Sequence, residues 1–475
     1  MSEGAAKKPE KPRKFQAIRG TRDLVPPDTA LWNHVEQTAN EVFSTYGFGE
    51  IRPPIFEPTE LFARSIGAET DVVSKEMFTF DTNRQFLEDY LAASPQERQI
   101  SDLMNASPSE VGLFAEQPEK AKPASEVVAL RPEATASVCR AYIEHNMQQM
   151  PQPVKLYYIG PMFRRERPQK GRYRQFYQIG AEILGGPDAP AIDAELIEML
   201  MTFFAKCGLA KTTLYINSIG HAADNCRRGY VAKLREELLK VKDKLGADSQ
   251  RRIETNPLRV LDSKLEHEQH LIEKLPRIAD CLCDDCKTHF AAVKRDLDLR
   301  GVKYEENWRL VRGLDYYMRT TFEITAQGLG SQNAVCGGGR YDGLVELLGG
   351  PPTKGIGFAI GEDRLILSLQ ETKSQSQVTS HQAPSVYIAW MGQGAYETAI
   401  HAAQTLRSAG FRVELPPVEQ KFGKALERAS KLGSRFALIL GDNEVQSGEW
   451  TLKTLAEGSQ QKLTEQALLE YLRKL

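Results

Sequence analysis

The sequence predicts a multidomain α+β protein whose functional residues lie on an antiparallel sheet. A chain of 475 residues is too long for one ordinary hydrophobic core. Two alternating segments, VKLYYIG from 154 and QFYQIGAEILG from 175, flank an arginine-rich loop and predict a pair of antiparallel strands. Residues 221–305 are charged and helix-like, which predicts a separate helical insertion domain.

Composition limits the class of protein. The formal net charge is −2 and 41% of the residues are hydrophobic, which indicates a soluble globular protein in which any nucleic-acid surface is local. The seven cysteines are an odd number and no apolar run resembles a signal peptide or a membrane span. We therefore expect a cytoplasmic protein with reduced thiols and no membrane partner.

The elements follow in order along the chain. Apolar residues repeat at helical spacing over 28–46, which predicts an amphipathic helix after Pro26 and Pro27. A second strongly helical pattern covers 186–210, and LYINSIG after it predicts a strand. The predicted divisions are a disordered tail at 1–14, a core at 15–370 with a polar insertion at 84–126, a linker at 371–385, and an α/β domain at 386–475.

The loop between the two predicted strands is the most unusual segment. GPMFRRERPQKGRYRQF, residues 160–176, holds six cationic side chains and one acid. Period-2 geometry places Phe176, Gln178, Gly180 and Glu182 on one face of the second strand, with apolar residues on the other. An ordinary hairpin with a solvated face would also have this alternation, but arginines match phosphate oxygens and six like charges favour a polyanion ligand.

A glycine-rich strand is predicted in GIGFAIGEDR, residues 355–364. Gly355, Gly357 and Ala359 fall on one face, which leaves room for a flat ligand. A helix that begins near Glu362 would place Arg364 beside that ligand. Close packing of a helix on the strand is the alternative explanation. No Rossmann or P-loop fingerprint occurs.

These segments resemble a known family. FRRERPQKGRYRQFYQIGAEILG resembles motif 2 of class II aminoacyl-tRNA synthetases, and GIGFAIGEDR resembles motif 3. QAIRGTRDLVP, LRPEATA and LVRGLDYYMRTTFE are similar to the histidyl-tRNA synthetase family. The resemblance implies a class II antiparallel-sheet catalytic domain with a helical insertion and a C-terminal α/β anticodon-binding domain. IRPPIFEPTELFARSIG is similar to motif 1, with Pro54 at its key position, and implies a homodimer.

The resemblance also implies the activity, which is ATP-dependent attachment of L-histidine to its tRNA through a histidyl-adenylate, with release of AMP and pyrophosphate. ATP would enter as a substrate with Mg²⁺. Arg164 would grip the α-phosphate and the histidine carboxylate, and Glu166 would meet the adenine amino group. Phe176 and Arg364 would sandwich the adenine, while Arg172 and Arg364 would reach the terminal phosphates.

Histidine would be recognised at both of its ends. The resemblance implies that Glu133, Thr135 and Gln178 hold the α-amino group. Glu182 and Tyr317 would bind the two imidazole nitrogens, and Tyr316 would line the pocket. A carboxylate and a phenol together satisfy both edges of an imidazole, which an apolar side chain of the same shape could not do.

Two further roles come from the same resemblance. Arg312 would place a fixed cation beside the reacting α-phosphate, although a buried ion pair with Asp315 is the alternative. Arg167, Gln169 and Lys170 in the loop would contact the acceptor end of the tRNA.

The segment CLCDDCKTH raises the question of a metal. Cys281, Cys283, Cys286 and His289 are zinc-ligand types within nine residues. Structural zinc usually takes two well-separated pairs of ligands, so we expect a reduced helical cysteine cluster and no protein-bound metal.

Two other functions compete with histidine charging. One is a non-catalytic paralogue, such as the synthetase-like regulatory subunit of ATP phosphoribosyltransferase, but this chain keeps the arginine-rich loop and a C-terminal domain. The other is a class II synthetase for another amino acid, which RGLDYY and Glu182 disfavour.

Overall fold

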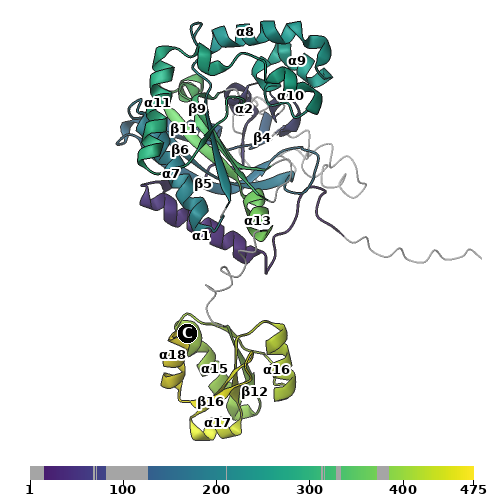
Figure 1. Ribbon diagram of the computed structural model, residues 1–475. Coiled ribbons are helices and arrows are strands. Elements are labelled where there is room, and N and C mark those ends of the chain that lie inside the picture. The colour runs from purple at the N-terminus through teal and green to yellow at the C-terminus, as the bar shows by residue number, and fades with distance from the viewer. Residues whose placement is uncertain are drawn as a thin grey trace, which may run out of the picture. The chain divides into compact units, whose positions relative to one another are not determined.

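The computed structural model describes residues 15–67, 70, 72–81, 127–209, 211–311, 314, 316–327, 333–371 and 385–474. The chain divides into two compact units, Met1–Ser374 and Gln375–Leu475 (Figure 1). The predicted tail at 1–14, the polar insertion at 84–126 and the linker apart from its two end residues lie outside the described residues.

The first unit is built on an eight-stranded sheet in the order β1-β5-β6-β11-β10-β9-β7-β8. Only the edge strands β1 and β8 pair in parallel, and all the inner pairs are antiparallel. This confirms the predicted α+β class. The strands are β1 (Gly49–Glu50), β5 (Val154–Phe163), β6 (Gln175–Leu184), β7 (Thr212–Ser218), β8 (Glu305–Glu306), β9 (Met318–Ala326), β10 (Ala334–Arg340) and β11 (Gly355–Gly361).

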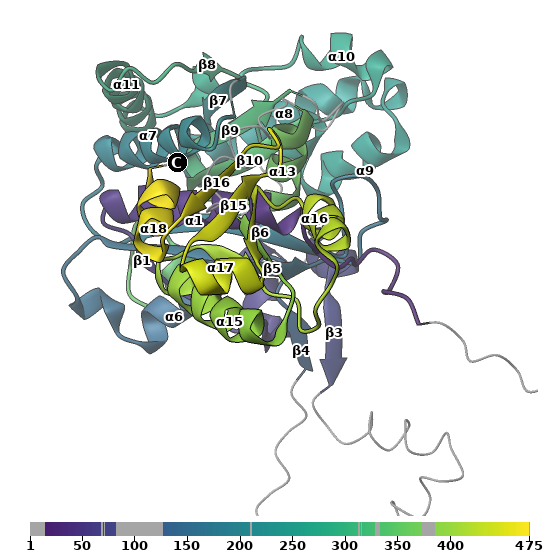
Figure 2. The same cartoon turned by 90° about the horizontal axis from the view of Figure 1, so that it is seen from below.

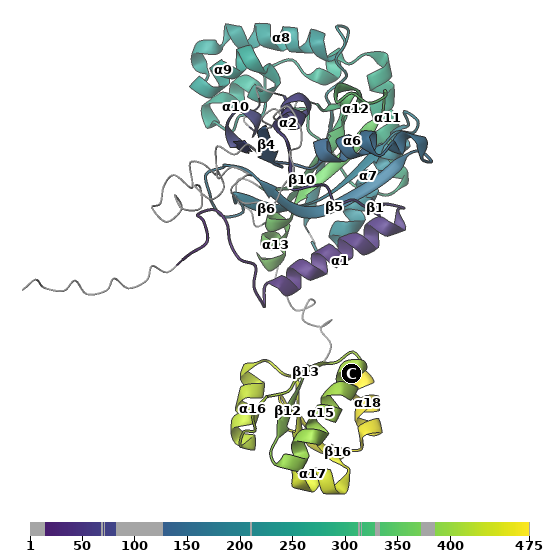
Figure 3. The same cartoon turned by 180° about the vertical axis from the view of Figure 1, so that it is seen from behind.

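The apolar face of this sheet packs against helices α1 (Thr29–Thr45) and α7 (Pro190–Lys206). Tyr177 of β6 lies edge-on to Trp32 with ring centroids 5.3 Å apart, and Phe358 of β11 lies 5.9 Å from Phe43. Figure 3 shows α1 along one side of the sheet and the helices α8, α9 and α10 on the other. The opposite, polar face of the sheet therefore lies on the side of these three helices.

Smaller elements complete this unit. Strands β2 (Phe56–Pro58), β4 (Val127–Leu130) and β3 (Phe78–Asp81) form a three-stranded antiparallel sheet, and Figure 2 shows β3 beside β4. Helix α6 (Thr135–Glu144) follows β4 and points its first turn at the large sheet. Three further α-helices outside the insert are α2 (Thr59–Ile66), α12 (Leu344–Leu347) and α13 (Glu362–Glu371).

The chain between β7 and β8 forms the predicted helical insert. It contains α8 (Arg227–Lys240), α9 (Ala247–Thr255), α10 (Glu266–Ile272) and α11 (Asp284–Leu299). Tyr230, Leu234, Ile253 and Ile272 are buried in a hydrophobic cluster that also includes Tyr317 from outside the insert. This shared core explains how the insert packs onto the rest of the unit although its surface is charged.

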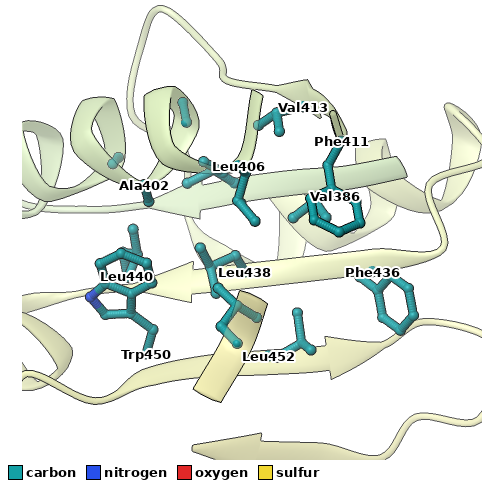
Figure 4. Close-up of a cluster of buried hydrophobic side chains, with 14 of the residues drawn as sticks. Val386, Ala402, Leu406, Phe411, Val413, Phe436, Leu438, Leu440, Trp450 and Leu452 are labelled. Atoms are coloured by element: carbon teal, nitrogen blue, oxygen red, sulfur yellow. The ribbon is translucent and has the colours of Figure 1, made fainter. Parts of the chain in front are cut away.

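The second unit has a five-stranded sheet in the order β13-β12-β14-β15-β16. Figure 4 shows its main core, in which Val386, Leu406 and Leu438 meet between the sheet and α15. Tyr387 and Ala389 point the other way, toward α16. The elements are β12 (Ser385–Trp390), α15 (Gln393–Ser408), β13 (Arg412–Glu414), α16 (Phe422–Lys431), β14 (Phe436–Leu440), α17 (Asp442–Ser447), β15 (Trp450–Thr454), β16 (Gln460–Leu463) and α18 (Glu465–Arg473).

Glu362, the first residue of α13, is buried with no hydrogen-bond partner for either carboxylate oxygen among the described residues. Burial raises its pKa well above the ordinary value, and the nearby Glu36 and Asp363 raise it further. A carboxyl group whose pKa is raised by folding stabilises the fold least at high pH, since stability falls as pH rises above its unfolded pKa.

We therefore expect Glu362→Gln to flatten this pH dependence. The variant should gain about 1–3 kcal/mol of unfolding free energy over the parent at pH 8.5, and the difference should shrink toward pH 5. Thermal and urea unfolding at pH 5, 7 and 8.5 measures this. Parallel curves for the two proteins across that range would show that Glu362 does not carry the effect.

Candidate active site

A cavity of about 650 Å³ lies over the polar face of the large sheet. Its floor comes from β6, β10 and β11, and one wall comes from α9 of the helical insert. Nine of the residues singled out from the sequence line it: Glu133, Thr135, Arg164, Glu166, Arg172, Phe176, Gln178, Tyr316 and Arg364. Arg312 lies outside the described residues.

Strand register explains why two separate sequence motifs meet in this cavity. Glu182 of β6 pairs with Gly357 of β11, and Gln178 pairs with Gly361. Directly paired residues on neighbouring strands point to the same face of a sheet. The polar face predicted for β6 and the bare face predicted for β11 are therefore one continuous surface.

One end of the cavity is strongly cationic. Arg164, Arg172 and Arg364 all line it, and Glu166 is an ion-pair partner of both Arg164 (3.8 Å) and Arg172 (3.4 Å). Burial lowers the pKa of Arg364, and the charges of Arg172 and Arg164 add to that effect. Such a concentration of guanidinium groups is suited to a polyphosphate.

The aromatic surface at this end is already covered by a cation. The guanidinium carbon of Arg164 lies 5.2 Å from the centroid of the Phe176 ring, and its Nε donates to the Pro132 carbonyl (3.0 Å). Arg364 is held by the carbonyls of Gly171 and Ala334. An aromatic base could stack on Phe176 only after Arg164 moves aside.

The other end of the cavity is acidic. The carboxylate of Glu133 accepts hydrogen bonds from the backbone N–H groups of Thr135 (2.7 Å) and Ala136 (3.0 Å) at the start of α6. Burial raises the pKa of Glu133, while these amides and Arg164 oppose that rise. A carboxylate fixed at a helix N-terminus in this way is ready to receive an ammonium group.

Glu182 lies deeper, beneath the cavity lining. Its carboxylate accepts hydrogen bonds from the hydroxyls of Thr135 and Tyr341, and its side chain is 1% exposed. Burial raises its pKa to about 8, although the Tyr341 and Thr135 bonds lower it. No local pattern marks Tyr341, which follows the glycine run of β10 and reaches Glu182 only through the fold.

The two tyrosines differ in position. Tyr316 lines the main cavity, whereas Tyr317 lines a neighbouring cavity of about 200 Å³ together with Arg227 and Arg259. The rings of Tyr316 and Tyr317 are in contact, with centroids 4.7 Å apart. The structure thus places Tyr316 in the lining of the main cavity, and Tyr317 lies in contact with it but in the lining of the neighbouring cavity.

The position of Gly357 under Glu182 gives a test of this packing. A Cβ atom at Gly357 would lie 1.6 Å from Glu182 Oε2, whereas at Gly361, on the same face of the same strand, the nearest atom would be in Arg364 at 3.8 Å. We expect Gly357→Ala to destabilise the protein by about 1–3 kcal/mol and Gly361→Ala to cost much less. Urea unfolding of both variants measures the contrast, and equal losses would contradict the close approach.

The remaining loop residues face outward. Arg167, Gln169 and Lys170 are exposed and do not line the cavity, and Lys170 forms an exposed ion pair with Glu371 (3.2 Å). Several cavity residues had no assigned role in the sequence because they come from other elements. These are Arg251, Arg252 and Arg259 of the insert and Glu323 of β9.

The cysteine segment has different partners from those considered in the sequence. Cys283 and Cys286 lie with His221 and Cys226, and these four offer ligand atoms within 4.8 Å of one another. His289 instead faces Asp193 at 3.8 Å, and Cys281 is not in the group. Cys281 and His289 therefore do not belong to a shared ligand set with the other two.

Comparisons with known proteins identify the family of the chain. A family model described as histidyl-tRNA synthetase matches residues 120–365, and one described as an anticodon binding domain matches residues 385–475. The chain is 51% identical to a histidine–tRNA ligase of Koribacter versatilis, over 97% of this chain and 96% of that protein. It is 48% identical to one of Solibacter usitatus, over 95% and 97%.

A solved structure gives the same picture. The crystal structure of apo S. aureus histidyl-tRNA synthetase superposes with a TM-score of 0.73 at 33% identity, covering 97% of this chain and 100% of that one. In the part of the chain that the structure describes, every helix is too short or too polar to cross a membrane. The family match and the near-complete coverage lead to one conclusion, which is that the chain belongs to the histidyl-tRNA synthetase family.

Proposed function

We propose that this chain attaches L-histidine to its tRNA in two steps at the cavity described above, with ATP as the second substrate. Histidine charging is the activity of its family. The observation that carries the assignment to this cavity is its charge pattern, with Glu133 at one end and Arg164, Arg172 and Arg364 at the other. A zwitterionic amino acid and a polyphosphate can lie end to end on such a surface.

Histidine occupies the acidic end in this proposal. Its α-ammonium group meets Glu133, Thr135 and Gln178, whose Oε1 atom is buried without a hydrogen-bond partner in the described structure. Its imidazole meets Glu182 on one nitrogen and a phenol on the other. Tyr317 supplies that phenol by turning toward the main cavity, and the adjacent Tyr316 forms the wall.

ATP occupies the cationic end. Adenine lies between Phe176 and Arg364, with Glu166 at its amino group, and the terminal phosphates lie against Arg172 and Arg364. Arg164 must leave the ring of Phe176 to reach the α-phosphate and the histidine carboxylate. When adenine displaces Arg164 from the Phe176 ring, the guanidinium group therefore moves to the α-phosphate and the histidine carboxylate.

The first step is attack of the histidine carboxylate oxygen on the α-phosphorus, which forms the adenylate and releases pyrophosphate. The residues act by position and charge, since no protein nucleophile is needed. Arg164, together with Arg312, stabilises the charge that develops on the α-phosphate. Mg²⁺ bound to ATP supplies further positive charge, and the carboxylate of Glu323 in the cavity is a suitable oxygen ligand for it.

In the second step a hydroxyl of the terminal adenosine of the tRNA attacks the carbonyl carbon of the histidyl-adenylate, which forms the ester and releases AMP. Arg167, Gln169 and Lys170 are exposed and directly precede Gly171 and Arg172, which line the cavity, and this supports their assignment to the acceptor end. The C-terminal domain, at about 386–475, binds the anticodon. In this proposal residues 15–370 form the catalytic core, and residues 371–385 form the linker between the core and the C-terminal domain.

A homodimer in the cytoplasm completes this proposal. Near Pro54, the side chains of Phe56 and Phe80 are 56% and 45% exposed, and an apolar surface of this kind supports a dimer contact. All seven cysteines lie in the described residues and none forms a disulfide there, in keeping with a reducing compartment.

The test is ATP–pyrophosphate exchange measured with each of the twenty amino acids, followed by charging of histidine tRNA. Exchange that depends on histidine alone is expected. No exchange with any amino acid would favour a non-catalytic histidine-binding paralogue. Exchange driven by a different amino acid would favour another class II specificity.

A further inference from the structure

Four metal-ligating side chains meet where the helical insert joins the large sheet. They are His221, Cys226, Cys283 and Cys286, and their ligand atoms all lie within 4.8 Å of one another. His221 Nδ1 is 3.1 Å from Cys286 Sγ and 3.8 Å from Cys283 Sγ. Four ligands around one tetrahedral zinc, at about 2.3 Å for sulfur and 2.0 Å for nitrogen, lie roughly 3.5–3.8 Å apart.

We propose that this group binds one Zn²⁺ through His221 Nδ1 and the thiolates of Cys226, Cys283 and Cys286. Three sulfur ligands and one imidazole in a tetrahedron are characteristic of a structural zinc site, and they select zinc over Mg²⁺. All four positions are taken by protein, so the ion has no open position for catalysis. Its place outside the cavity agrees with that role.

The ligands come in two separated pairs, which is the arrangement that structural zinc prefers. His221 and Cys226 lie just before α8, where the insert begins. Cys283 and Cys286 lie at the start of α11, which is the last helix of the insert. Only the second pair is visible as a cysteine cluster in the sequence. The ion therefore closes the loop formed by α8, α9 and α10 at its base.

The surroundings of the sulfur atoms fit a bound cation. The backbone N–H groups of His221 and Cys283 donate to the Cys226 sulfur. Gly220 has φ +63°, and a Cβ there would lie 2.7 Å from Cys226 Sγ, so the chain passes directly against the sulfur. Such outer contacts orient metal ligands in known sites.

The four ligands also leave access for an entering ion. Cys226 and Cys286 are buried, while His221 and Cys283 are only half-buried and leave a route for the ion.

The site also holds part of the histidine pocket. Two backbone hydrogen bonds join the segment before His221 to Arg319. Ile219 N–H donates to the Arg319 carbonyl, and Arg319 N–H donates to the Gly220 carbonyl, both at 2.8 Å. Arg227, the residue after Cys226, donates to the carbonyl of Tyr317. Loss of zinc would loosen the segment that carries Tyr317 as well as the insert.

The experiment is metal analysis of the purified full-length protein, grown with added zinc, by inductively coupled plasma mass spectrometry. We expect about one zinc per chain in the wild type. Cys226→Ser and Cys283→Ser should each lower the zinc content at least ten-fold. Cys281→Ser is the matched control, because Cys281 is two residues from Cys283 but outside the group, and it should keep the full content.

Wild-type protein alone gives a second measurement that does not depend on the folding of a variant. Protein prepared with Co²⁺ should show thiolate-to-cobalt charge transfer and the intense visible bands of tetrahedral cobalt. Less than a tenth of a zinc per chain together with no such bands would overturn the proposal, and so would loss of zinc in Cys281→Ser. Neither readout uses catalysis, so failure here is distinct from failure of histidine charging.

Discussion

Arg164→Ala should lower histidine-dependent ATP–pyrophosphate exchange by about two to three orders of magnitude, which is the usual cost of removing one donor that stabilises developing charge. Arg164 is the cation of the cationic end that lies nearest Glu133, since its Nε donates to the Pro132 carbonyl, and it lies over Phe176. It is therefore placed to meet both reacting groups. The loss should appear mainly in the maximal rate, because Arg172 and Arg364 remain to bind the terminal phosphates.

Arg165→Ala is the matched control. Arg165 is the next residue in the same loop, but its guanidinium lies 5.2 Å from the Phe78 ring and does not line the cavity. Its exchange rate should stay within about three-fold of the parent, as expected for an exposed side chain away from the chemistry. Equal losses in the two variants would indicate a general effect of loop charge and would contradict the assigned role of Arg164.

The contrast between these two neighbours also separates the roles of the loop cations. Arg164 and Arg172 face the cavity, Arg167 and Lys170 face solvent, and Arg174 packs its side chain against Gly20. A count of charges indicates that the loop binds a polyanion, but it cannot tell which cations face the cavity and which face solvent. The division depends on which way each residue leaves the β5–β6 hairpin.

Much of the site could be predicted because strands have a period of two. The alternation in β6 assigns Phe176, Gln178 and Glu182 to one face, and the alternation in β11 assigns Gly357 and Ala359 to one face. What the alternation cannot give is the pairing between strands that lie far apart in sequence. Register supplied that information and joined the two faces into one surface.

The residues that were missed share a physical reason. Tyr341 reaches Glu182 across the sheet, and Arg251 enters the cavity from a separate helical insert. His221 and Cys226 approach Cys283 from the opposite end of that insert. In each case the partner is close in space but distant in sequence, and no local pattern marks it.

Glu182→Gln should raise the KM for histidine by about 10- to 100-fold and leave the KM for ATP within about three-fold, because a hydrogen bond to a charged group contributes about 1.5–3 kcal/mol. Glutamine has the same shape, so the backbone of β6 and the contact with Gly357 are kept. Only the ability to become a carboxylate is removed. Initial rates of pyrophosphate exchange at varied histidine and varied ATP measure both constants.

Tyr341→Phe distinguishes binding from packing in this result. It removes the hydroxyl that donates to Glu182 but keeps the aromatic ring, which is buried against Gly355. Because the carboxylate survives, its histidine KM should rise less than that of Glu182→Gln. An equal or larger rise in Tyr341→Phe would mean that the shape of the pocket, and not the charge of Glu182, determines histidine binding. A change in the ATP constant as large as that for histidine would place Glu182 outside the amino-acid site, because the proposed adenine site at Phe176 lies near the other end of β6.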